Sequence, residues 1–167
     1  MRVPLSLVAV LASASSAGAE FSYITSYSTW QSIVPSYTTV DLVDLNAGDW
    51  LSDQYASLGV IFDGGFIEES PDSFVQDGHG VWGGCFVTMT LATPAFAVGS
   101  HHPGAMRFDL YQGDTLLYTS IATGSGYNNF RGVVSTVPFD RVVLRGITLG
   151  PPSCDGISVD NFYFASV

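Results

Sequence analysis

One carboxylate near the end of the chain stands in a stretch that is otherwise suited to a β-strand. Asp160 lies within residues 157–164, a run rich in β-branched and aromatic side chains. Because alternate residues of a strand share a face, Asp160 is predicted to point to the same apolar layer as Phe162 and Phe164. A buried carboxylate without a partner costs several kcal/mol. The sequence therefore predicts that Asp160 is held by a cation or by several donors, and an alternative in which a neighbouring turn supplies the donors without any metal stays open.

Aromatic residues in polar, glycine-rich stretches indicate a second kind of chemistry. Sugar sites place an aromatic ring against a pyranose and use polar side chains to fix the hydroxyl groups. Trp82, beside Gly83 and Gly84, is the first candidate for such a ring, with simple packing over a sheet edge as the alternative. Trp50 and Tyr127 are further aromatic candidates, and the possible polar partners are Asn128, Asn129, Arg107, His101 and His102.

A catalytic arrangement is not evident. Glu68 and Glu69 are adjacent on one segment, whereas a glycosidase holds two carboxyl groups about 5 to 9 Å apart across its sugar. The sequence has no GxSxG elbow, HExxH helix or phosphate-binding loop. A non-catalytic protein is favoured, and an enzyme that degrades polysaccharide is the weaker alternative.

The charge balance is strongly acidic. Fifteen Asp and Glu residues against five Arg and no Lys give a formal net charge of −10. Such a surface repels phosphate backbones and anionic headgroups, so nucleic acid is not expected as a partner. Clustered carboxylates suit hard cations, and outside a cell the most available of these is calcium.

Residues 1–19 have the pattern of a secretory signal peptide. Arg2 gives a positive start, residues 5–12 are apolar apart from Ser6, and residues 17–19 are small enough for cleavage. No later stretch approaches the roughly 20 continuous apolar residues of a membrane-spanning helix. The mature chain is expected to be secreted, without membrane insertion, with residues 20–37 as a leader of uncertain order and residues 38–167 as the folded domain.

The two cysteines indicate one disulfide. Cys85 and Cys154 make an even count in a chain expected outside the cell. A bond between them would close a loop of about 70 residues and stabilise the fold by about 4 kcal/mol in the chain-entropy model. Two buried free thiols are the alternative.

Short β-prone runs separated by turn residues dominate the rest of the chain. Residues 106–111 and 115–121 form the clearest hairpin. Further strands are predicted at 58–62, 85–91, 95–99, 130–134, 141–147 and 157–164. Residues 66–84 are predicted to form a long surface loop, with one short strand within it as an alternative. No helical period is evident, and for residues 29–33 a short helix and an irregular segment both stay open. The predicted fold is all-β, an antiparallel β-sandwich of jelly-roll type.

Several phrases, in their order, resemble a known family. An acidic opening at residues 40–49 precedes Tyr55-x-x-x-Gly59-Val60-x-Phe62, and residues 95–99, 130–134 and 157–164 follow. Residues 40–164 thereby resemble the β-sandwich ectodomains of bacterial PEP-CTERM sorted exoproteins, which are similar to galactose-binding-like and carbohydrate-binding jelly rolls. The Pro-Glu-Pro motif, apolar helix and basic tail of that class do not occur before Val167, so release without a C-terminal sorting anchor is expected.

The resemblance implies a structural calcium ion between the first and last strands. Asp41, Asp44 and Asp160 are the carboxylates it implies, completed by main-chain or Asn carbonyls. The family often has Asp-Phe-Glu in its opening strand, and here Val43 stands in place of the second acid.

The expected function follows from these features together. The sequence indicates a secreted, non-catalytic module that binds extracellular carbohydrate or a cell-surface polymer and contains a structural calcium ion. A structural or matrix protein of the bacterial exterior is the alternative, because a fold does not fix a function.

Overall fold

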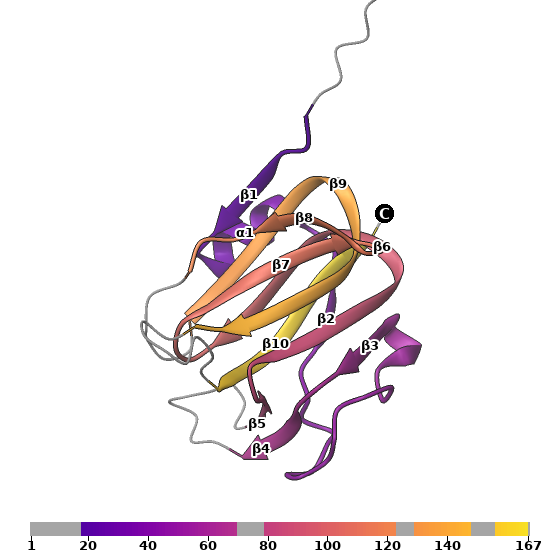
Figure 1. Cartoon of the computed structure of the whole chain (residues 1–167), viewed down its shortest axis with the longest axis vertical. Coiled ribbons are helices and arrows are strands. Elements are labelled where there is room, and N and C mark those ends of the chain that lie inside the picture. Colours follow the sequence, from indigo (N-terminus) through magenta and orange to yellow (C-terminus); the bar gives the residue numbers. More distant parts are fainter. Residues whose placement is uncertain (1–17, 70–78, 123–128, 148–155, 167) are drawn as a thin grey trace, which may run out of the picture.

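The computed structural model describes residues 18–69, 79–122, 129–147 and 156–166. Within them the strands pair antiparallel throughout (Figure 1). The elements in chain order are β1 (Phe21–Ile24), α1 (Tyr27–Ile33), β2 (Thr38–Val40), the 3-10 turn η1 (Ala56–Leu58), β3 (Val60–Asp63), β4 (Phe66–Glu69), β5 (His79–Gly83), β6 (Phe86–His102), β7 (Met106–Gln112), β8 (Thr115–Thr119), β9 (Asn129–Gly146) and β10 (Ile157–Ser166). No helix in the described ranges has the length and apolar character that crossing a membrane requires.

Two long strands, β6 and β9, belong to both layers of the sandwich. The first half of β6 pairs with β3 and with the second half of β9, which continues to β7 and β8. The second half of β6 pairs with β10 and with the first half of β9, and this layer ends in β2 and β1. Figure 1 shows both strands as long curved ribbons. Strands that pass from one sheet to the other form the corners of such sandwiches.

The predicted breaks in these strands were wrong. Residues 85–91 and 95–99 were expected as two strands because Pro94 stands between them, yet residues 86–102 form the single strand β6. The pairing with β9 is irregular between Thr90 and Ala97, so Pro94 falls where the ladder is already interrupted. A proline is tolerated at such a bulge because its missing N–H is not needed there. The strands predicted at residues 130–134 and 141–147 are likewise joined in β9, which ends at Gly146.

The core lies between the two layers and is built by alternation. Met106, Phe108 and Leu110 of β7 are buried while Arg107 and Tyr111 are not fully covered, as a strand with one inward face requires. Other strands contribute the inward residues Val60, Phe62, Val87, Met89, Val98, Val133, Val142, Leu144, Phe162 and Phe164. The prediction of an all-β antiparallel sandwich of jelly-roll type is confirmed.

Residues 20–37, whose order the sequence left open, form β1 and α1. β1 pairs with β9. α1 begins after Ser26, whose side chain accepts a hydrogen bond from the Thr29 amide at 3.4 Å. Trp30 of α1 is fully buried in a second apolar cluster on the outer face of the β10–β6–β9 layer, with Ile24, Val34, Ala97, Phe130 and Tyr163. With only seven residues, α1 is too short to leave a helical period in the sequence.

The expected long surface loop at residues 66–84 is a hairpin in its described part. β4 and β5 pair with each other, and β5 pairs with the start of β10. In Figure 1 these strands and β3 lie in the lower part of the molecule, away from α1 and β1 at the upper left. Residues 70–78, between β4 and β5, lie outside the described residues.

Candidate functional site

Three exposed aromatic side chains stand in line on the outer face of the β4–β5 hairpin. Phe66 of β4 lies directly opposite Trp82 of β5, and Trp50 forms a bridge to Phe66 from the other side. Residues that lie directly opposite each other in a sheet project from the same face. The exposed fractions are 60% for Trp50, 37% for Phe66 and 40% for Trp82. These three residues are called the aromatic row below.

Each residue of the aromatic row has a core residue next to it in the sequence. Ile67 follows Phe66, Val81 precedes Trp82 and Leu51 follows Trp50, and all three of these apolar residues are buried. Each aromatic side chain therefore belongs to the outward face of a segment whose inward face packs in the core.

Backbone geometry holds Trp50 close to Phe66. Hydrogen bonds of 3.1 and 2.8 Å join residues 49–51 to residues 65–67 on either side of this pair. In an antiparallel ladder such a pair is the narrow, non-hydrogen-bonded kind, with about 4.5 Å between its Cα atoms. The Phe66 and Trp82 rings, on the other side, have centroids 5.4 Å apart and planes inclined at 49°.

The Trp82 indole packs against the backbone at Gly156. A Cβ atom on Gly156 would lie 3.0 Å from the indole Nε1 and Cζ2 atoms of Trp82, so the ring rests against backbone at the start of β10. The indole is therefore packed along one edge, while Trp82 as a whole remains 40% exposed.

A carboxylate and a hydroxyl adjoin the aromatic row. Ser158 of β10 lies opposite Trp82, and its hydroxyl donates a hydrogen bond to Glu68 Oε1 at 2.5 Å. Glu68 follows two residues after Phe66 and therefore shares its face. It lies opposite Gly80, and because glycine has no side chain, the Glu68 carboxylate can extend across β5 to reach Ser158.

The other predicted glycan ligands are distributed differently. Arg107 lies on β7, where its Nε is 3.5 Å from Asp109 Oδ1, and β10, β6 and β9 separate β7 from β5 in the strand order. Asn129 begins β9, opposite His102. Neither is brought to Trp82, and Tyr127 and Asn128 lie outside the described residues. Trp50 was one of the aromatic candidates, but the sequence did not connect it with Trp82, and Phe66 was not predicted. Only the strand register aligns both residues with Trp82.

Asp160 is fully buried, but its predicted orientation was wrong. The pairing of β10 with β6 shifts between Asp160 and Phe162, where Asn161 has φ +44°. The shift places Asp160 opposite His101, whose ring packs with Tyr163 on the outer face. The bulge thus separates Asp160 from the inward face that carries Phe162.

The environment of Asp160 is aromatic and polar. The Tyr163 hydroxyl and His101 Nδ1 are 3.1 Å apart. Burial raises the pKa of Tyr163, and the neighbouring Tyr27 and Asp160 raise it further. Ser100 donates a hydrogen bond to the Asp160 carbonyl oxygen at 3.1 Å.

Asp41 and Asp44, the other implied calcium ligands, are both exposed beyond the end of β2. Asp44 Oδ1 accepts a hydrogen bond from the Tyr55 hydroxyl. Burial raises the pKa of Tyr55, and its bond to Asp44 adds to this shift. The described part of the chain contains no group of three or more His, Cys, Asp or Glu side chains able to hold a metal. A calcium ion on these three aspartates stays a prediction.

The predicted disulfide falls partly outside the described residues. Cys85 is exposed in the turn that joins β5 to β6, and Cys154 is not among the described positions. The pairing stays a prediction, which the mass of the intact protein before and after reduction would test.

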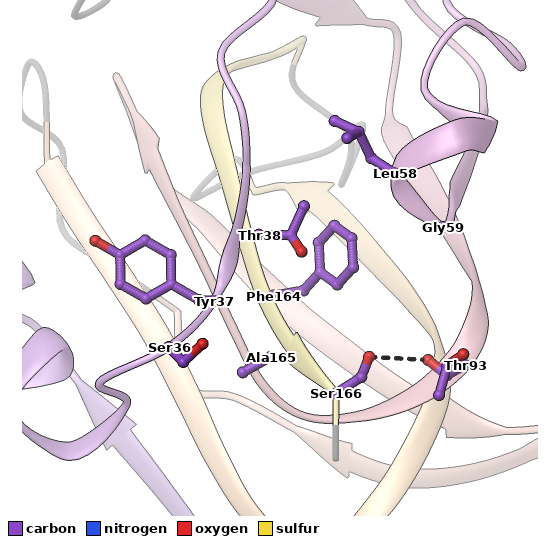
Figure 2. Close-up of a pocket in the computed structure, with 9 residues that line it drawn as sticks. All are labelled: Ser36, Tyr37, Thr38, Leu58, Gly59, Thr93, Phe164, Ala165 and Ser166. Carbon is purple, nitrogen blue, oxygen red and sulfur yellow. Dashed lines mark hydrogen bonds between the residues drawn. The ribbon is translucent and has the colours of Figure 1, made fainter.

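A cavity of about 360 Å³ opens at the other end of β10. Figure 2 shows Thr38 and Phe164 beside it, with Leu58 and Gly59 across from them. The Ser166 hydroxyl donates a hydrogen bond to the Thr93 carbonyl at 3.3 Å. The residues that line the cavity include no Asp, Glu, His, Lys or Arg. The lining residues therefore offer hydroxyl and apolar contacts, but no charged acid or base.

His102, at the end of β6, makes the stability of the fold depend on pH. Burial lowers its pKa to about 4, and the charge of Arg131 adds to this effect. The unfolded chain binds the proton near pH 6.5. Stability from the neutral imidazole is therefore complete above pH 6.5 and is lost as pH falls toward 4.

We expect the free energy of unfolding to fall by about 2 kcal/mol between pH 7.5 and pH 5 on account of His102. Urea titrations at both pH values would measure the fall in the wild type and in His102→Asn. The variant should show a smaller fall, and an equal fall in both proteins would contradict the assignment. His79→Gln, a change at a partly exposed imidazole, is the matched control.

Comparison with known proteins adds one structural similarity. No protein-family model matches the chain, and no curated protein matches it. A solved structure of a mutant of CBM29-2, a family 29 carbohydrate-binding module studied for its ligand recognition, is similar over 78% of this chain and 92% of that one, with 11% identity and a TM-score of 0.45. No residue or ligand is carried over from it. The resemblance to PEP-CTERM exoproteins stays a prediction. The fold and the site define an antiparallel β-sandwich with an exposed aromatic row.

Proposed function

We propose that this chain is a secreted, non-catalytic module that binds a carbohydrate polymer through the aromatic row. The observation that carries the proposal is the alignment of Trp50, Phe66 and Trp82 on one face, each more than a third exposed. Aromatic rings are large apolar surfaces, and exposed ones that gather in a patch mark binding sites. A pyranose presents an apolar face of C–H groups that fits such a ring.

The dimensions of the aromatic row suit a chain of sugars. Its members lie on three neighbouring strand segments, and neighbouring strands are about 4.8 Å apart. The row therefore spans about 10 Å from Trp50 to Trp82, which is enough for more than one sugar ring. Glu68 and Ser158 adjoin it with oxygens that can bond to hydroxyl groups.

Replacing Trp82 with alanine is expected to weaken polysaccharide binding at least about tenfold, because stacking on an indole combines apolar burial with a preformed flat surface. Affinity electrophoresis through gels that contain β-glucan, mannan, xylan or soluble chitin derivatives would measure the retardation of each protein. Leu116→Ala, which truncates an exposed apolar residue on β8, is the control and should be retarded like the wild type.

Two results would contradict the proposal. The first is a folded wild-type protein that no polymer retards, which would leave a structural role outside the cell as the better account. The second is retardation that Trp82→Ala leaves unchanged, which would place the sugar elsewhere on the surface.

We also propose that calcium binds near the start of β10, with Asp160 as a ligand. The support is the complete burial of the Asp160 side chain at a bulge of β10. A ligand bound only by the folded state must raise its stability. Calcium is therefore expected to raise the Tm of the wild type and to have a smaller effect on Asp160→Asn, measured by calorimetry with calcium or EGTA. A Tm that neither addition changes would remove the ion from the proposal.

A further inference from the structure

We infer that the aromatic row prefers polymers whose sugars carry free ammonium groups, such as polyglucosamine, and that Glu68 binds the ammonium group. This inference rests on the proposed carbohydrate binding and goes beyond it by naming the class of sugar. Its basis is the position of one carboxylate and the distribution of charge around the aromatic row.

The Glu68 carboxylate is fixed beside Trp82. The Ser158 hydroxyl, opposite Trp82, donates to Glu68 Oε1 at 2.5 Å, which orients the carboxylate across β5. Its second oxygen, Oε2, has no partner among the described residues. Glu68 is also partly exposed. An ammonium group on a sugar held by Trp82 can therefore meet an oriented carboxylate oxygen, and hydrogen bonds between charged groups are the stronger kind.

The surroundings of the aromatic row are acidic. The described segments 46–69, 79–83 and 156–160 contain no Lys or Arg, and their carboxylates are Asp49, Asp53, Asp63, Glu68, Glu69 and Asp160. Beyond residue 19 the described arginines lie on β7 and β9, where Arg145 and Arg107 pair with Asp109. In a chain with a net charge of −10, this distribution gives the row a negative potential. It attracts ammonium groups and repels uronate or sulfate groups.

The aromatic side chains themselves add to the same preference. The face of an indole or phenyl ring attracts a cation, most strongly for tryptophan. A sugar amine that approaches Trp82 therefore meets the ring and the Glu68 carboxylate together. A neutral acetamido group has no charge for the ring or the carboxylate to attract. A sugar with a free amine and the same sugar with an acetamido group therefore provide a direct comparison.

Calorimetric titration with two oligosaccharides of equal length and linkage, one of glucosamine and one of N-acetylglucosamine, tests the inference at a pH where the amines are protonated. The wild type is expected to bind the glucosamine oligomer roughly tenfold more tightly at low salt, and this ratio should shrink as salt screens the charges. Glu68→Gln keeps an acceptor for Ser158 but removes the charge, and should bring the ratio close to one.

Glu69→Gln is the matched control, because it removes the same charge from the exposed neighbour whose side chain alternates to the other face. It should retain most of the preference. Equal affinity of the wild type for both oligomers, with binding lost in Trp82→Ala, would overturn the inference and leave the proposed function intact. A preference that survives in Glu68→Gln would also overturn it. Failure to bind either oligomer or any neutral polymer would contradict both proposals.

Discussion

Replacing Trp30 with alanine is expected to lower the free energy of unfolding by about 3–5 kcal/mol. Trp30 is fully buried, and its indole fills the space between α1 and the outer face of the β10–β6–β9 layer. Its ring lies 5.8 Å from that of Phe130 and 6.0 Å from that of Tyr163, measured between centroids. A Cβ atom on Gly132 would lie 2.6 Å from Trp30 Cδ1, so the indole rests directly on β9. Its removal leaves a cavity that these neighbours cannot close.

Trp50→Ala provides a control with the same change of side chain. Trp50 is 60% exposed, so its removal should alter the free energy of unfolding by less than about 0.5 kcal/mol while weakening carbohydrate binding. Urea denaturation monitored by circular dichroism would measure both variants. Similar losses from Trp30→Ala and Trp50→Ala would show that α1 does not pack as described.

Replacing Gly65 with alanine is expected to destabilise the fold by about 3 kcal/mol and to abolish retention by carbohydrate gels. Gly65 immediately precedes β4 and has φ +103°, a conformation that residues with a Cβ atom rarely adopt. A Cβ atom there would lie 2.4 Å from Val81 Cγ1 and 3.3 Å from the Trp82 carbonyl oxygen. The hairpin must therefore shift to accept alanine, and with it the register that aligns Phe66 with Trp82.

Gly84→Ala separates this effect from a general loss of glycine. Gly84 lies in the turn after β5, has no positive φ, and a Cβ atom there would meet nothing within 4 Å. This variant should unfold and bind like the wild type. The prediction for Gly65 fails if both alanine variants have the same denaturation midpoint and the same retardation.

The strands were largely predictable because their residues carry the signal locally. Alternation in residues 106–111, followed by the β-prone run at residues 115–121, predicted the hairpin of β7 and β8. In two other segments the local sequence pattern led to a wrong prediction. Pro94 indicated a break, but the break is a bulge within β6. The glycine and acidic residues of segment 66–84 indicated a loop, although β4 and β5 pair there.

The candidate site was predictable only in part. Trp82 was recognised from its type and its glycine neighbours, since an aromatic ring in a polar segment is itself informative. Its partners Trp50 and Phe66 lie 32 and 16 residues away in sequence, and strand register is not written in any one of these segments. The face to which Asp160 points depends on a bulge at Asn161. Asn161 has a left-handed backbone conformation, which asparagine tolerates better than most residues do.

The aromatic row shows which features of the site follow from the sequence and which depend on the tertiary structure. By itself the sequence determined the all-β class and the acidic charge balance, because composition and alternation are local properties. It also identified Trp82 and Asp160 as individual residues that need a partner. Only the tertiary structure decided that Trp50, Phe66 and Trp82 stand in line and that Glu68 reaches Ser158 across Gly80. Register, bulges and the absence of a side chain at one facing position are properties of paired strands, so they arise only when distant segments meet.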